Sequence, residues 1–66
     1  MPVWIKATGD LTREPYPMEL VHTRQEARVV EIDSQAQQAV RGASKLYPQH
    51  SWKRVKVSGG YVIEGQ

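Results

Sequence analysis

Cysteine is absent from this sequence, and so is any long run of apolar residues. Without cysteine the chain forms neither a disulfide framework nor a zinc–thiolate site, which is unlike small secreted domains. No segment approaches the roughly 20 apolar residues that a membrane-spanning helix needs, and the first residues lack the basic start and apolar run of a signal peptide. We therefore expect a soluble protein of the cytoplasm.

Acidic residues are missing from Ser34 to Gly60. The half of the chain before Ser34 carries four basic and six acidic residues, whereas the half that starts there carries five basic residues and Glu64 alone. Such a basic stretch attracts phosphate or an acidic protein surface. The alternative is a solvated surface whose cations pair with the acidic N-terminal half in the folded chain.

Patterns for catalysis are also missing. His22 and His50 stand at no metal-ligand spacing from each other or from a suitable carboxylate, and no serine lies in a nucleophile signature. Ser58-Gly59-Gly60 is not followed by the helix that a phosphate-binding loop requires. We expect no enzyme activity, no catalytic residue, no cofactor and no metal site.

The length of the chain limits the size of its core. A chain of 66 residues corresponds to a single domain, residues 1–66, which buries only about 60% of the surface that its unfolded chain exposes. The expected net stability is a few kcal/mol. This leaves little room for a large pocket.

The centre of the sequence predicts a helix from Ser34 to Tyr47, which Pro48 ends. Ser34 is a favourable N-cap residue, and apolar residues follow at helical spacing. Gly42 borders the apolar side, where a glycine either allows a close approach to the sheet or is simply tolerated. The helix residues that we place in the core are Ala39, Val40, Ala43 and Leu46.

Alternating apolar and polar residues predict five strands: Pro2–Ala7, Met18–Thr23, Glu26–Asp33, Ser51–Val57 and Tyr61–Glu64. The second and third form a hairpin or one long bent strand, and we prefer the hairpin because a strand of more than about ten residues is long for so small a sheet. Gly59-Gly60 predicts the other hairpin. The expected fold is α+β: a small, mostly antiparallel sheet with one helix packed on one face, in the order β, β-hairpin, α, β-hairpin.

The sheet face opposite the helix is the candidate binding face. If the valines and the isoleucine of the first and fourth strands point at the helix, the two-residue period directs Trp4, Lys6, Trp52, Arg54 and Lys56 away from it. Lys53 adds a further cation on the same basic strand. The predicted binding residues are Trp4, Lys6, Trp52, Lys53, Arg54 and Lys56.

Three interpretations of this face stay open. Exposed tryptophans among cations form a platform for single-stranded nucleic acid, because bases stack on the rings while the cations meet phosphates. The same composition is typical of a protein-binding hot spot. Alternatively, the tryptophans are covered by the Leu11–Pro17 loop or by self-association, which would make a homodimer.

The run VVEIDSQAQQAVRGASKLYPQHSWKRVKV, residues 29–57, resembles a pattern common in very small phage and prophage proteins. The pattern is a strand, a Ser-capped Ala-rich helix, an aromatic-Pro stop and a basic strand, and some anti-CRISPR proteins look similar in size and element order. The resemblance implies a stoichiometric inhibitor that occludes a site on a host complex. We therefore expect a non-enzymatic binding protein that docks on a host protein or nucleoprotein complex, with direct binding of single-stranded DNA or RNA as the alternative.

Overall fold

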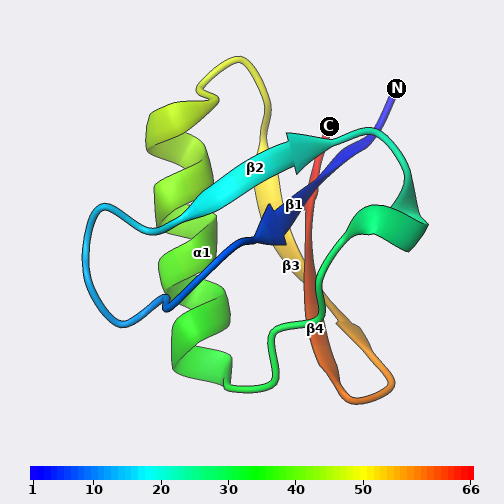
Figure 1. Ribbon diagram of the computed structural model, residues 1–66. Coiled ribbons are helices and arrows are strands. Elements are labelled where there is room, and N and C mark those ends of the chain that lie inside the picture. The colour runs from blue at the N-terminus through cyan, green and yellow to red at the C-terminus, as the bar shows by residue number, and fades with distance from the viewer.

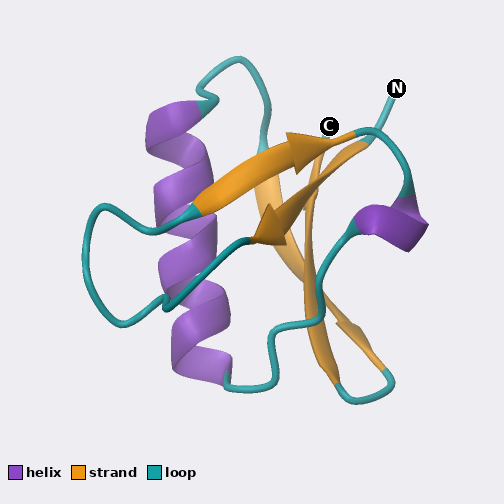
Figure 2. Ribbon diagram, viewed as in Figure 1, coloured by secondary structure: helices purple, strands orange, loops and turns teal.

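A computed structural model describes residues 1–66. One α-helix packs on a four-stranded antiparallel sheet (Figure 1), and Figure 2 shows the helix and the sheet as two layers. The elements are β1 (Val3–Ala7), β2 (Met18–Val21), the 3-10 helix η1 (Arg24–Glu26), α1 (Asp33–Leu46), β3 (Trp52–Val57) and β4 (Gly60–Gly65). The predicted α+β fold is confirmed. Neither helix is long and apolar enough to cross a membrane.

The strand order is β2-β1-β4-β3, so that β2 and β3 form the two edges. β1 pairs with β4 only at Val3 and Trp4. Further along β4, Val30 takes the place of β1: its backbone N–H donates to the Tyr61 carbonyl at 2.7 Å and its carbonyl accepts from the Tyr61 N–H at 2.9 Å. The chain that leads into α1 is therefore held by β4.

The predicted strand Glu26–Asp33 is wrong, and so is its hairpin with Met18–Thr23. Only Val30 makes a β-bridge, and β2 ends at Val21. Residues Arg24–Glu26 fold into η1 instead. Here the Thr23 hydroxyl donates to the Glu26 carboxylate at 2.7 Å, and the Glu26 N–H donates to the Thr23 carbonyl at 3.2 Å. These local bonds replace the positive-φ turn that a tight hairpin needs.

Small side chains bring α1 close to the sheet. Ala36, Ala39 and Ala43 are fully buried, against a sheet layer that includes Ile5 and Ile63. At Gly42, an added Cβ atom would lie 2.8 Å from the Met18 Cε atom and 2.9 Å from the Tyr16 Cδ2 atom. The close-approach interpretation of this glycine therefore holds, although the approach is to β2 and the loop before it.

The ends of α1 differ from the prediction. The helix begins at Asp33 with Ile32 at the N-cap position, so the Ser34 cap is wrong; the Asp33 carboxylate accepts a hydrogen bond from the Gln37 side chain at 3.3 Å. Leu46 is 52% exposed and does not belong to the core. It is the last helical residue, and the core at this end is filled by Tyr47 and Trp52.

The face opposite the helix carries a second, smaller apolar layer. Val21 and Val62 are buried although they are not part of the core on the helix side, and Val55 and Val57 are half-buried. η1 contacts β1, and Figure 1 shows the connection from β2 to α1 on this side of the sheet. This face is therefore partly covered and is not an open platform.

Burial predicts opposite outcomes for two aliphatic truncations. Ile63→Ala removes a fully buried side chain and should lower the free energy of unfolding by about 2 to 5 kcal/mol. Leu46→Ala removes a half-exposed side chain and should change it by no more than about 0.5 kcal/mol. Urea unfolding followed by circular dichroism measures both, and equal losses would contradict the assignment of the core.

Candidate functional site: a basic edge of the sheet

Trp52 belongs to the core. It is 9% exposed, and its indole Nε1–H donates to the Tyr47 carbonyl at 3.0 Å. Its ring centroid lies 6.2 Å from that of Tyr47 and 5.6 Å from that of His50, the latter edge-on. Opposite it on β4 is Gly65, where a Cβ atom would come within 2.7 Å of the indole ring. The missing side chain of Gly65 makes the space that the indole fills.

The two tryptophans therefore lie on opposite faces of the sheet. Trp4 is paired with Glu64 and Trp52 with Gly65, and consecutive residues of β4 point to opposite sides. The prediction that both indoles share the face away from the helix is wrong for Trp52. Burying the indole, which is larger than a valine side chain, reverses the assumed orientation of the whole strand β3.

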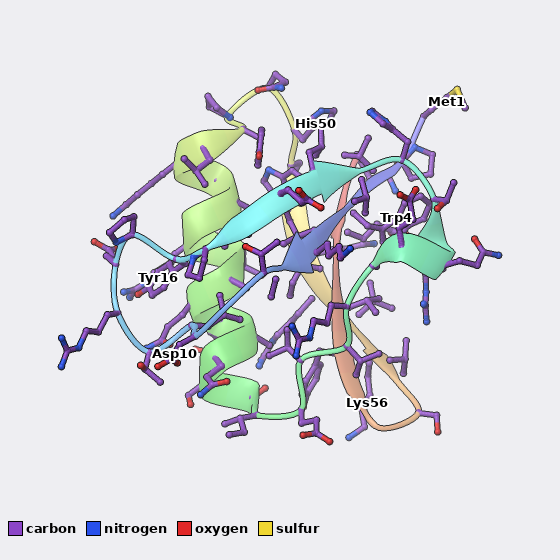
Figure 3. The ribbon with its side chains drawn as sticks, viewed as in Figure 1. Met1, Trp4, Asp10, Tyr16, His50 and Lys56 are labelled. Atoms are coloured by element: carbon purple, nitrogen blue, oxygen red, sulfur yellow. The ribbon has the colours of Figure 1, made fainter.

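Trp4 does lie on the face away from the helix, but it is half-buried. Figure 3 places its side chain on the side of β1 that faces η1, so the cover comes from the segment after β2 and not from the Leu11–Pro17 loop. The Trp4 indole Nε1 is buried without a hydrogen-bond partner. Lys6, the next predicted residue on this face, is exposed with its Nζ atom 4.0 Å from the Glu19 carboxylate.

The cations of β3 separate onto the two faces. Arg54 and Lys56 share the helix side with Tyr61: the Arg54 guanidinium carbon lies 5.4 Å from the Tyr61 ring centroid and the Lys56 Nζ atom 5.6 Å. Both distances lie in the range of a cation–π contact. Arg54 also forms an ion pair with Asp33 at the start of α1. Lys53 points to the other face and is exposed.

Only part of the positive charge of the C-terminal half is neutralised by carboxylates of the N-terminal half. Lys45 pairs with Glu14 at 2.9 Å, and Arg54 pairs with Asp33. Arg41, Lys53 and Lys56 are exposed and have no carboxylate within ion-pair distance.

An open hollow between α1 and β3 brings Arg41, Lys53 and Arg54 together, and Lys56 lies further along β3. The hollow is lined by Gln37, Val40, Arg41, Lys53 and Arg54. We name Arg41, Lys53, Arg54 and Lys56 the basic edge. The sequence pattern did not identify Arg41, because helical spacing places it on the polar side of α1 and gives no sign that this side borders β3.

The structure contains no group of three or more His, Cys, Asp or Glu residues that could hold a metal ion. No polar or charged residue is buried. Comparisons with protein-family models, with curated proteins and with solved structures find no significant match.

The close fit between Trp52 and Gly65 predicts that a single added methyl group at residue 65 disturbs the packing. Gly65→Ala places a Cβ atom against a rigid ring that a hydrogen bond holds in position, so we expect it to cost about 1 to 3 kcal/mol of stability. In a Trp4→Phe background, the remaining tryptophan emission should also shift to the red. Gln66→Ala, at the next and exposed position, is the control and should leave both the unfolding midpoint and the emission unchanged.

Proposed function

We propose that this protein is a small, non-enzymatic binding protein that docks through its basic edge on an acidic surface of a larger protein or nucleoprotein complex. The observation that carries the proposal is the position of Arg41, Lys53 and Lys56 on or beside the edge strand β3, where they are exposed and have no carboxylate within ion-pair distance. A cluster with an excess of one charge steers an oppositely charged partner toward it and raises the association rate.

The resemblance to small phage-encoded inhibitors supports a particular kind of partner, a host complex in the cytoplasm. The protein would block this complex by occluding one of its sites. The size of the protein suits this role. A standard interface takes about 800 Å² from each partner, which is about a fifth of the 4250 Å² surface of this chain. An interface of standard size would therefore take about a fifth of the surface of the protein, which suits a complex of one inhibitor with one target.

The alternative is direct binding of single-stranded DNA or RNA. Its support is now mainly charge, because Trp52 is in the core and Trp4, which lies on the same face as Lys53, is half-buried. Because these rings are not fully exposed for stacking, such binding would rest mainly on phosphate contacts. It would then fall with salt by about 0.7 log units of affinity per log unit of salt for each phosphate neutralised.

The proposal predicts that reversing two charges of the basic edge abolishes docking. The immobilised protein is incubated with nuclease-treated bacterial lysate, and the captured complex is quantified. Arg41→Glu with Lys53→Glu should reduce capture at least tenfold, because it turns attraction into repulsion. Arg13→Glu with Arg24→Glu changes the net charge equally at two exposed positions outside the basic edge and should leave capture unchanged.

Two results would contradict the proposal. Equal losses for both double variants would mean that net charge matters and the basic edge does not. Capture that occurs only without nuclease, together with steeply salt-dependent binding of a labelled single-stranded oligonucleotide, would favour the nucleic-acid alternative. Trp52→Ala is unsuitable for this test because removing the buried indole costs about 3 to 5 kcal/mol of folding stability.

A further inference from the structure

The backbone of β3 has one side without a partner. β3 lies at the end of the sheet and pairs with β4 alone. Next to the strand, Ser51 and Gln66 exchange both backbone hydrogen bonds, at 3.1 and 3.0 Å. Bonded and non-bonded pairs alternate along an antiparallel ladder, so the next residues bonded to β4 are Lys53 and Val55. The backbone N–H and C=O groups of Arg54 and Lys56 consequently point to the open side.

The side chains along this open side form a defined pattern. Arg54 and Lys56 stand on the helix side, whereas Lys53, Val55 and Val57 stand on the other. A strand laid beside β3 would match it with acidic residues opposite the three cations and apolar residues opposite the two valines, since directly opposed cross-strand pairs interact most strongly. For a segment that runs antiparallel to β3, the matching order from its N-terminus is apolar, acidic, apolar, acidic, acidic.

We propose that the partner binds by adding an acidic, extended segment of this pattern to β3 as a fifth strand of the sheet. The inference rests on the proposed function and specifies how that docking occurs. Main-chain hydrogen bonds to Arg54 and Lys56 supply affinity, and alternate side chains supply selectivity, as in other cases of strand addition.

Charge identifies the occupant as an acidic protein segment. A second copy of this chain is disfavoured, because antiparallel pairing of two β3 strands centred on Arg54, Val55 or Lys56 puts two cations directly opposite each other. A nucleic acid offers phosphates to the cations but no alternating peptide N–H and C=O groups for the free backbone.

The test uses the whole protein and a labelled peptide with the order Thr, Val, Glu, Val, Glu, Glu, Thr. Binding at low salt should slow amide hydrogen exchange of Arg54 and Lys56, while the amides of Lys53 and Val55, already bonded to β4, should not change. Lys56→Glu should weaken peptide binding at least tenfold, and the control Arg13→Glu should not.

Methylation of the peptide backbone separates strand addition from simple charge attraction. N-methyl groups on the two glutamates that face Lys56 and Arg54 remove the N–H groups that would bond to β3, and should weaken binding about tenfold or more. N-methyl groups on the two valines point away from β3 and should change affinity less than about twofold.

Several outcomes would overturn the inference. Equal binding of the two methylated peptides, with unaltered exchange at Arg54 and Lys56, would leave charge-driven docking in place but exclude a fifth strand. Failure of the parent protein to bind the unmodified peptide, or protection of the same two amides by a single-stranded oligonucleotide instead, would exclude an acidic segment as the occupant. The lysate experiment tests the proposed function separately, because it measures docking on the larger complex and does not use the peptide.

Discussion

Burial of the Trp52 indole against Gly65 fixes the direction of every side chain in β3. Because side chains alternate along a strand, an inward residue 52 turns Arg54 and Lys56 to the helix side and leaves Val55 and Val57 on the other. The indole has more apolar area than either valine, and its N–H finds the Tyr47 carbonyl. The valines are still half-buried on their face. The placement of the cations is thus a consequence of packing.

The alanine face of α1 connects this packing to the charge of the edge. Side chains as small as Ala39 and Ala43 let the helix lie close over the sheet, and at its N-terminal end Asp33 reaches Arg54. That contact neutralises one cation of the basic edge and leaves the positive charge of the other three exposed to solvent. Lys45, on the same helix, is paired with Glu14 in the loop before β2. The residual positive charge is therefore concentrated beside β3, although basic residues are spread over the whole C-terminal half.

The sequence predicts the fold well and the site poorly, for a physical reason. Helical spacing over four turns is a strong signal, so α1 is predicted to within a residue at each end. In β3, apolar residues occur on both faces of the strand, with Trp52 on one face and the valines on the other. The alternation alone therefore does not tell which face points to the helix, and only the register with β4 shows it. The segment around Val30 has the alternating pattern of a strand, but it pairs with β4 only through a single bridge at Val30. Arg41 joins the site only through the approach of two distant elements.

The two edges of the sheet are unequal, and this inequality selects what can bind. β2 is four residues long and carries Glu19, whereas β3 is six residues long and carries three cations. Positive charge along an edge strand prevents edge-to-edge pairing of identical chains. The same charges would attract an acidic strand, so in the proposed strand addition one set of residues opposes pairing with a second copy and favours the partner. Salt screens such attraction beyond about 8 to 10 Å. In the proposed complex, charge would therefore act mainly on the approach, and the free backbone groups of β3 would then hold the segment in register.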